Sequence, residues 1–304
     1  MNILIVGLGS IGKRHLESIL NHKTKLNLYL YDLKNFNYGY SKNNHIIKKI
    51  DKLPNKECFD LVIISTTSID RYKILKSLIS RNQINNILIE KVAFLKIDNY
   101  KKALTIKNVF INYPRPLMNS YICLKNFIKN KKLNSLTVHG NGWNMLSNSL
   151  HFLNLFSFLT DRPLTKINSF KIHNRKYRSK RNYFDEIKGE ILFTNNFNQS
   201  LKLIDKPNNQ INFLEIKLKN YLINVYENKS FIEIIDQNNQ IINKEIFKVE
   251  YQSDLTIEYL SKLNNKKFQY MNLKKNIKNE ILYLDFINQL KLSNKKIFNN
   301  LIYT

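Results

Sequence analysis

The chain has 304 residues, enough for two domains, and 43% of them are hydrophobic, so each domain can bury a core. No apolar run is long enough to cross a membrane, and the first residues lack the pattern of a signal peptide. The two cysteines, Cys58 and Cys123, have no metal-ligand spacing and fit a reducing compartment. We therefore expect a cytoplasmic protein with no membrane insertion and no bound metal.

The formal net charge of +26 favours, taken alone, a nucleic acid or an acidic ligand as partner. Lysine, asparagine and isoleucine are over-used along the whole chain, which is typical of an AT-rich genome. The lysines are scattered, and no RNA-binding motif accompanies them. We expect no nucleic-acid partner, although the positive potential would help to attract an anionic sugar or nucleotide.

Apolar strands alternate with helices in the first third of the chain. The patterns predict strands at residues 2–6, 26–32, 60–66, 85–91 and 108–114, and helices at 10–22, 70–80 and 100–106, with a weak helix and connector at 43–53. This alternation predicts βαβ units and a doubly wound parallel sheet, an α/β Rossmann domain. Pro114 and Pro116 then punctuate the chain, so we expect this first domain to span residues 1–116.

The second part of the chain, residues 117–304, has a different pattern. Helical periodicity marks residues 117–129, 149–159 and 279–292, and a strand is predicted at 133–140. Five further strands follow one another with hairpin-length gaps, at 188–194, 199–204, 211–218, 221–227 and 230–236. These predict an α+β domain with a large, mostly antiparallel open sheet, whose exposed face would form oligomers.

The stretch VGLGSIGKRH, residues 6–15, carries Gly7, Gly9 and Gly12 in the spacing G-x-G-x-x-G between a predicted strand and a predicted helix. In a dinucleotide site these glycines allow the tight turn, the close approach of the pyrophosphate and the packing of helix on strand. Asp32 ends the next strand, where its carboxylate would bind the adenosine ribose and repel a 2′-phosphate. We predict NAD, with NADP less favoured although Lys34 lies nearby; the alternative is a glycine turn kept for packing.

Polar side chains end the last two predicted strands of the first domain, at the edge where such sheets bind ligands. Lys91, after Glu90, would hold a substrate hydroxyl and ease its deprotonation if its pKa is lowered; otherwise it is a surface lysine. Asn112 and Arg115 flank the end of the following strand. Arg115 would bind a carboxylate or phosphate with its two-pronged guanidinium, or form an interdomain salt bridge.

His151 is the main ionisable group of an otherwise apolar helix. Asn148 and Asn154 lie three residues before and after it, on the same helical face, which favours a site over a core histidine. Trp143, the sole tryptophan, precedes this helix and would stack on a sugar ring or belong to the core.

GLGSIGKRH, the EK of IEKVAF, NYPRP and SNSLHFLNLF together resemble the Gfo/Idh/MocA oxidoreductases. The resemblance covers most of the chain and is strongest over residues 1–160. It implies a Rossmann domain joined to an α+β domain with a large open sheet, and NAD(P)-dependent chemistry on sugars, inositols and related polyols. Trp143, Asn148, His151 and Phe152 are similar to members linked to bacterial surface sugars, including nonulosonic acid clusters.

The resemblance implies that Lys91 and His151 are the catalytic groups. Together with the motifs above, it assigns cofactor contacts to Gly7, Gly9, Ser10, Ile11, Gly12, Asp32, Thr66, Glu90 and Lys91. It assigns substrate contacts to Asn112, Arg115, Trp143, Asn148, His151, Lys180 and Arg181. The last two lie in a basic segment that would meet an acidic sugar or a nucleotide phosphate.

Four positions depart from the family's pattern. Val92 replaces the proline after the Glu-Lys pair, and Asn154 replaces the aspartate after the histidine. After the third strand, Thr67 and Arg71 replace a proline and a histidine. An amide orients an imidazole but does not stabilise its charged form, so Asn154 weakens the expectation of acid–base chemistry. The cofactor motif is unaffected.

We therefore expect an NAD-dependent oxidoreductase that transfers a hydride at a carbon of a sugar or nucleotide-linked sugar, in bacterial surface polysaccharide biosynthesis. His151 would be the general acid/base and Lys91 would hydrogen-bond the reacting oxygen. A retained, recycled cofactor would make the net reaction an epimerisation. The alternative is a non-catalytic or regulatory dinucleotide-binding protein of the same pathway. An exposed sheet face would be covered in a homodimer or homotetramer.

Overall fold

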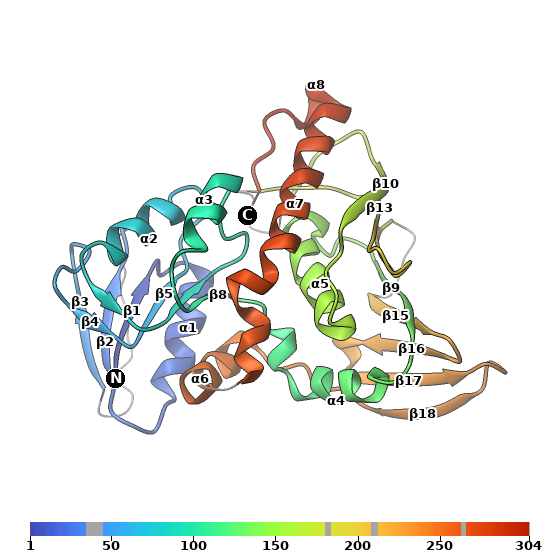
Figure 1. The fold of residues 1–304 in the computed structure, drawn as a ribbon, viewed down its shortest axis with the longest axis horizontal. Coiled ribbons are helices and arrows are strands. Elements are labelled where there is room, and N and C mark those ends of the chain that lie inside the picture. Colours follow the sequence, from blue (N-terminus) through green and yellow to red (C-terminus); the bar gives the residue numbers. More distant parts are fainter. Residues whose placement is uncertain (35–44, 180–183, 208–211, 263–265, 304) are drawn as a thin grey trace. The chain divides into compact units, whose positions relative to one another are not determined.

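The computed structural model describes residues 1–34, 45–179, 184–207, 212–262 and 266–303, and the chain forms two compact units (Figure 1). The first unit comprises Met1–Pro114 and Glu250–Ile277, and the second comprises Arg115–Val249 and Lys278–Thr304. The sequence predicts one boundary near residue 116; in the structure, residues 250–277 also belong to the first unit.

A six-stranded parallel sheet forms the centre of the first unit, in the order β3-β2-β1-β5-β7-β8. Its strands are β1 (Asn2–Val6), β2 (Asn27–Tyr31), β3 (Ile46–Lys49), β5 (Leu61–Ile64), β7 (Ile87–Ile89) and β8 (Val109–Ile111). Figure 1 shows α1 (Ser10–Leu20) on one side of the sheet, and α2 (Arg71–Ile79) and α3 (Ile97–Ala103) on the other. The predicted doubly wound fold is confirmed.

The central strands β5 and β7 are buried throughout, as expected for strands covered on both faces. The predicted weak helix at 43–53 is wrong, because Ile46–Lys49 pairs in parallel with β2 as the edge strand β3. Three of the four β3 residues are exposed, so hydrogen bonds of the backbone hold the strand in the sheet. Because few of its side chains are buried, the sequence shows no apolar pattern that would predict a strand. A short parallel pair, β4 (Cys58–Phe59) with β6 (Gln83–Ile84), lies outside the main sheet.

Helix α6 (Gln252–Lys262) belongs to the first unit, where it packs on α1. The sequence patterns do not predict α6. The backbone N–H of Ile257 donates to Ser18 Oγ of α1 at 2.8 Å. A short helix, η3 (Lys266–Met271), leads into α7 (Leu273–Ser293), which crosses from the first unit to the second.

An eight-stranded sheet forms the second unit, in the order β10-β13-β14-β9-β15-β16-β17-β18. Its strands are β9 (Leu133–Gly140), β10 (Lys166–Ile172), β13 (Gly189–Thr194), β14 (Ser200–Asp205), β15 (Phe213–Leu218), β16 (Tyr221–Tyr226), β17 (Phe231–Asp236) and β18 (Ile241–Ile246). Every neighbouring pair is antiparallel except β14 with β9, which confirms the large, mostly antiparallel sheet. The edge strands β10 and β18 have no sequence prediction, since most of their residues are exposed.

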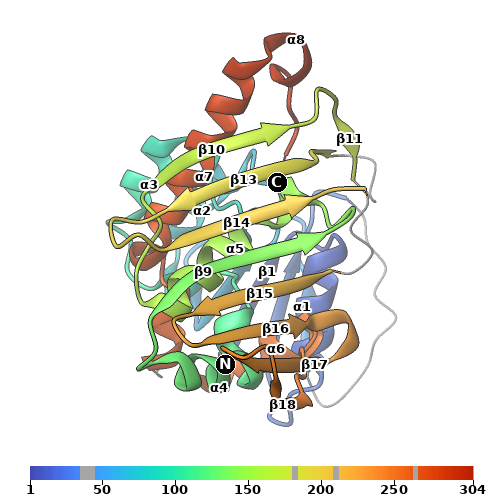
Figure 2. The same cartoon turned by 90° about the vertical axis from the view of Figure 1, so that its right-hand side faces the viewer.

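Helices α4 (Asn119–Ile128), α5 (Met145–Thr160) and the later part of α7 lie on one face of this sheet. Figure 2 looks onto the other face, where no described helix lies. The smaller elements of the unit are β11 (Tyr177–Arg178), β12 (Asp185–Glu186), η1 (Arg115–Leu117), η2 (Glu227–Lys229) and α8 (Lys295–Phe298). Helix α5 begins four residues before the predicted start at 149.

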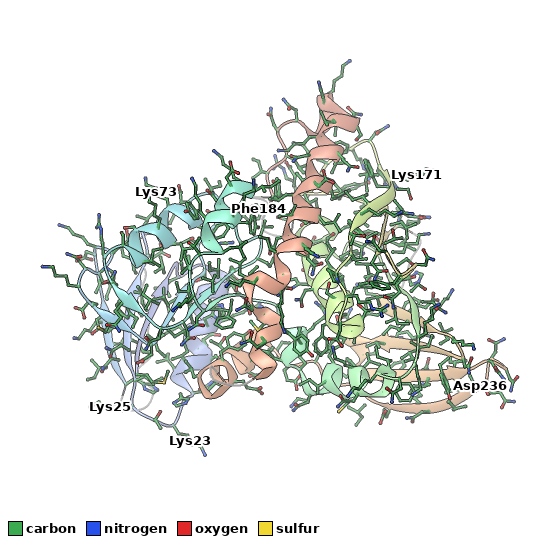
Figure 3. The ribbon with its side chains drawn as sticks, in the orientation of Figure 1. Lys23, Lys25, Lys73, Lys171, Phe184 and Asp236 are labelled. Atoms are coloured by element: carbon green, nitrogen blue, oxygen red, sulfur yellow. The ribbon has the colours of Figure 1, made fainter. Side chains whose placement is uncertain are left out.

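Lysine side chains are spread over many elements. Figure 3 labels Lys23 and Lys25 in the turn before β2, Lys73 on α2 and Lys171 on β10, all exposed. The positive charge is therefore not gathered on one helix or strand. Within the described ranges, no helix has the length and apolar character needed to span a membrane.

Candidate functional site

The glycine-rich turn joins β1 to α1, and its three glycines differ in what surrounds them. Gly7 has φ +93°, and a Cβ there would lie 2.8 Å from the backbone N of Thr66. A Cβ on Gly12 would lie 1.9 Å from the carbonyl oxygen of Gly7. Both glycines are therefore required by the packing of the turn.

Gly9 is different, because a Cβ there would meet nothing within 4 Å and the residue has an ordinary φ of −66°. Gly9 is also the N-cap of α1, which has no side-chain cap and no acidic residue in its first turn. A helix start of this kind presents backbone N–H groups and a positive dipole end to an anion. The open space over Gly9 fits a dinucleotide's pyrophosphate.

Asp32 follows β2 and lies against this turn. Its Oδ2 accepts a hydrogen bond from the backbone N–H of Leu8 at 2.5 Å, and its Oδ1 accepts one from the N–H of Lys34 at 2.8 Å. Two exposed apolar side chains follow the strands on either side of β1: Leu33 after β2, at 87% exposed, and Ile69 after β5, at 70% exposed. An adenosine at this edge would find a carboxylate for its ribose and apolar surface for its base.

Glu90, after β7, is held in a buried hydrogen-bonded network. Its Oε1 accepts from Nδ2 of Asn112 at 2.5 Å and from Nε2 of His15 at 3.0 Å. The other ring nitrogen of His15 contacts Thr256 Oγ1 at 2.8 Å, and the hydroxyl of Tyr259 donates to Oδ1 of Asn112 at 2.6 Å. Helix α1 thus contacts the carboxylate that precedes Lys91 directly, and α6 supports it through His15 and Asn112.

This network keeps Glu90 ionised. Burial by itself would raise the pKa of Glu90, but the hydrogen bond and charge of His15, with the bond from Asn112, outweigh burial and hold the pKa below its usual value. Asn112 is only 2% exposed, and both ends of its amide hold partners inside the unit. Asn112, which the sequence assigns to substrate binding, therefore positions the side chain of Glu90.

Arg71 stands where the family pattern has a histidine, and its buried guanidinium donates to three backbone carbonyls: those of Thr66, Glu90 and Val92. It joins the loop after β5 to the loop after β7. Lys91 lies between two of these anchored residues and is half-buried. The Arg71 contacts therefore fix the backbone on both sides of Lys91.

In the second unit, His151 is half-buried on α5, and Asn154 beside it is 2% exposed. The first turn of this helix is capped by the buried carboxylate of Glu186, which accepts from the N–H of Leu146 at 2.8 Å and from the hydroxyl of Ser147. Near the same end, Nδ2 of Asn148 donates to the carbonyl of Trp143 at 2.7 Å. The start of the His151 helix is thus rigidly held.

A cavity of about 180 Å³ opens beside this helix, and we refer to it as the tryptophan cavity. It brings together three expected substrate residues, Arg115, Trp143 and Asn148. Its other lining residues are Val138, His139, Phe152, Asn212, Phe213, Leu214, Val225, Glu227 and Asn228. His151 does not line it.

Arg115 is paired inside the second unit, with Glu227. Its Nε and Nη2 donate to the two carboxylate oxygens at 2.9 and 2.8 Å, and the guanidinium lies 4.6 Å from the centre of the Phe152 ring. Trp143 donates its indole N–H to the carbonyl of Ile204 at 2.9 Å and meets Phe152 edge to face. The expected residues Lys180 and Arg181 lie outside the described residues.

Sequence reasoning missed His15, Thr256, Tyr259 and Glu227. His15 lies in the glycine-rich stretch itself. Its side chain is fully buried, at 0% exposed, and only the fold reveals this burial. The other three come from distant parts of the chain, with no local pattern around them.

No family model matches the chain, and no curated protein matches it by sequence. Several solved structures share its fold. The dehydrogenase MviM from Clostridium difficile is 13% identical, with 95% of this chain and 99% of that chain covered and a TM-score of 0.63. UDP-N-acetylglucosamine 3-dehydrogenase GnnA from Acidithiobacillus ferrooxidans is 11% identical, with 98% and 99% covered and a TM-score of 0.64.

A third solved structure, a Gfo/Idh/MocA family oxidoreductase from Vibrio cholerae, is 10% identical to the chain. It covers 96% of this chain and 99% of its own, with a TM-score of 0.66. Identities this low speak for the fold, and the fold is matched from end to end. The chain therefore has the fold of the Gfo/Idh/MocA oxidoreductases, as its sequence motifs predict.

Proposed function

We propose that the protein is an NAD-dependent oxidoreductase that transfers a hydride between the nicotinamide and a carbon of a sugar or nucleotide-linked sugar. One observation carries this proposal: the space over Gly9 is open, in a turn where Gly7 and Gly12 are tightly packed. A glycine that the fold does not need is explained by a ligand that approaches the backbone. Asp32 beside the turn supports NAD over NADP.

The nicotinamide, when bound, supplies or accepts the hydride. His151 is the general acid/base that takes or gives the proton of the reacting oxygen, and Lys91 hydrogen-bonds that oxygen and stabilises charge that develops on it. Glu90 and Arg71 support this role of Lys91 because they fix the backbone around it. Arg115, Trp143 and Asn148 orient the sugar.

The substrate class follows from the tryptophan cavity and from the family fold. Aromatic rings and amides of the kind found there suit a sugar. The similar GnnA is named for its action on UDP-N-acetylglucosamine, which supports a nucleotide-linked sugar as substrate. From the sequence motifs we further propose a cytoplasmic role in bacterial surface polysaccharide biosynthesis. Lys180 and Arg181 would meet an acidic group or a phosphate of that substrate.

We also propose a homodimer or homotetramer formed through the face of the large sheet on which no described helix lies (Figure 2). A row of half-buried aromatic rings crosses four strands of this sheet: His139, Phe213, Tyr226 and Phe231, with centroid spacings of 4.5, 5.4 and 4.5 Å. Their strand neighbours Val138, Leu214, Val225 and Ile232 are buried, so alternation along each strand places the rings on the opposite face. Rows of this kind are usually covered. Light scattering tests this, and a monomer at working concentration would contradict it.

Titration calorimetry with NAD, NADH, NADP and NADPH tests the proposed cofactor, after a spectroscopic check for retained cofactor. We expect clear preference for NAD(H). Turnover of nucleotide-linked sugars should then fall at least about a hundredfold in Lys91→Met and in His151→Gln, with NAD binding retained in His151→Gln. Absence of binding, with no cofactor retained, would overturn the proposal.

Asn154 favours a second candidate, a regulatory dinucleotide-binding protein of the same pathway. The buried amide provides no carboxylate to stabilise a charged His151. Tight NAD binding without turnover of any sugar, unchanged in His151→Gln, would support this candidate. Turnover that depends on His151 would exclude it.

A further inference from the structure

The tryptophan cavity carries almost no net charge, although the chain as a whole carries +26. Among the described residues that line it, only Arg115 and Glu227 carry permanent charges, and these are opposite. His139 adds none at neutral pH, because burial lowers the pKa of its imidazole below the usual value. By contrast, a larger cavity at the other end of β9 is lined by Lys125, Lys129, Lys131, Lys132 and Arg162.

The Arg115–Glu227 pair is geometrically complete. Nε and Nη2 of the guanidinium meet both carboxylate oxygens, and the Tyr121 hydroxyl donates a further bond to Oε1. Burial would raise the pKa of Glu227, but the charge and hydrogen bonds of Arg115, with the bond from Tyr121, hold it below the usual value. Glu227 therefore stays ionised and neutralises Arg115 at the cavity wall.

The remaining lining combines aromatic rings with amides. Trp143 and Phe152 supply ring surface for the C–H face of a sugar, while Phe213 stacks between His139 and Tyr226. Among the described residues, Oδ1 of Asn148 accepts no bond while its Nδ2 is engaged, and Asn212 has the reverse arrangement, with Oδ1 accepting from the N–H of Asn141 at 3.0 Å. One amide thus offers an acceptor and the other a donor, which matches a hydroxyl group.

We propose that the tryptophan cavity binds an uncharged sugar ring, and that Glu227 sets this preference by neutralising Arg115. A carboxylate in the cavity would approach Glu227 and would have to displace it from Arg115, at a cost in like-charge repulsion. The volume of about 180 Å³ lies below the range of pockets for drug-sized ligands and suits one ring. The proposal rests on the proposed sugar chemistry and narrows it to neutral sugars.

The position of Trp143 allows a direct test, because it is the sole tryptophan and lines the cavity. Its fluorescence is titrated with UDP-N-acetylglucosamine, with the 6-carboxylate of the same nucleotide sugar, and with UDP alone. The proteins compared are wild type, Glu227→Gln and Glu190→Gln. The control removes the same charge from a carboxylate paired with Lys202 and Lys206 on the same sheet, so it reports the general effect of charge on anionic ligands.

In the wild type we expect the neutral sugar to bind at least about tenfold more tightly than the carboxylate, and UDP alone to change the fluorescence little. In Glu227→Gln this preference should shrink about tenfold or invert, while Glu190→Gln keeps it. Equal affinities in the wild type, equal shifts in both variants, or a full response to UDP alone would each overturn the proposal.

Failure of the proposed function gives a different result. If the proposed oxidoreductase function is wrong, the protein binds no NAD and turns over no sugar. The difference in affinity between the neutral sugar and the carboxylate, measured by Trp143 fluorescence, depends on neither of these results. A protein that binds NAD but whose Trp143 responds to neither sugar in any variant would overturn the assignment of the cavity while leaving the cofactor proposal intact.

Discussion

His15 and Glu90 form a buried contact, with Nε2 of the histidine 3.0 Å from Oε1 of the glutamate. The histidine lies on the helix that starts at the glycine-rich turn, and the glutamate directly precedes Lys91. This contact therefore joins the proposed pyrophosphate site to the backbone of a proposed catalytic lysine. Its two side chains are 0% and 10% exposed.

Replacement of His15 tests how much this contact stabilises the first unit. His15→Phe leaves the Glu90 carboxylate buried without its main partner, so the free energy of unfolding should fall by about 3 kcal/mol in urea denaturation. The control is His22→Phe, whose ring hydrogen-bonds only to nearby Thr24. That variant should stay within about 0.5 kcal/mol of wild type, and equal losses in both would contradict the role of His15.

The glycine turn gives a pair of variants with opposite outcomes. Gly9→Ala should fold with stability close to wild type, because its Cβ meets nothing within 4 Å, but bind NADH at least about tenfold more weakly. Gly12→Ala should be destabilised by about 2 kcal/mol, since its Cβ would overlap the Gly7 carbonyl. Thermal unfolding and calorimetry measure the two effects. Unchanged NADH affinity in a folded Gly9→Ala would count against a cofactor over this turn.

Asp32 should determine the choice between NAD and NADP. Asp32→Asn removes the charge that would repel a 2′-phosphate while an amide oxygen remains to accept from Leu8, so the preference for NADH over NADPH should fall about tenfold, or about 1.4 kcal/mol. Asp60→Asn is the matched control, because Asp60 precedes β5 at the opposite edge of the sheet and binds the N–H of Asn2. A preference unchanged in Asp32→Asn would show that another residue discriminates.

The second unit should lose stability in acid through Glu190. Hydrogen bonds from Lys202 and Lys206 lower the pKa of Glu190 from 4.5 to about 2. A pKa lowered by folding stabilises the folded state above the unfolded value, and this contribution is lost as the pH falls from about 4.5 to about 2. Wild type should therefore exceed Glu190→Gln in stability at neutral pH, with the difference vanishing near pH 2.

Urea denaturation across this pH range measures the difference. Asp98→Asn serves as the control, because Asp98 is 77% exposed and its pair with Lys101 is open to water. The Asp98 difference should be small and flat across the range. A Glu190→Gln difference that is equally flat would exclude the lysine pairs as the cause.

Periodicity and motif spacing predicted the alternation of the first unit and the antiparallel hairpins of the second, since burial on one or two faces leaves a direct imprint on the sequence. The edge strands β3, β10 and β18 have few buried residues, so the patterns predicted a helix wrongly for β3 and nothing for β10 and β18. Backbone pairing holds such edge strands, and any side chain can accompany it. The sequence also does not predict the first turn of α5. The carboxylate that caps this turn belongs to Glu186, which lies 40 residues after Leu146 in the chain, so no local pattern marks the start of the helix.

The sequence by itself determined the doubly wound fold and the proposed dinucleotide turn, because Gly7, Gly9, Gly12 and Asp32 act through local backbone geometry that their spacing already encodes. Only the tertiary structure decided which glycine faces open space, that Asn112 holds Glu90, and that Glu227 neutralises Arg115. The Asn112–Glu90 contact joins residues that are 22 positions apart in the chain, and the Arg115–Glu227 contact joins residues that are 112 positions apart. At such separations, the periodicity of the sequence does not indicate which side chains meet.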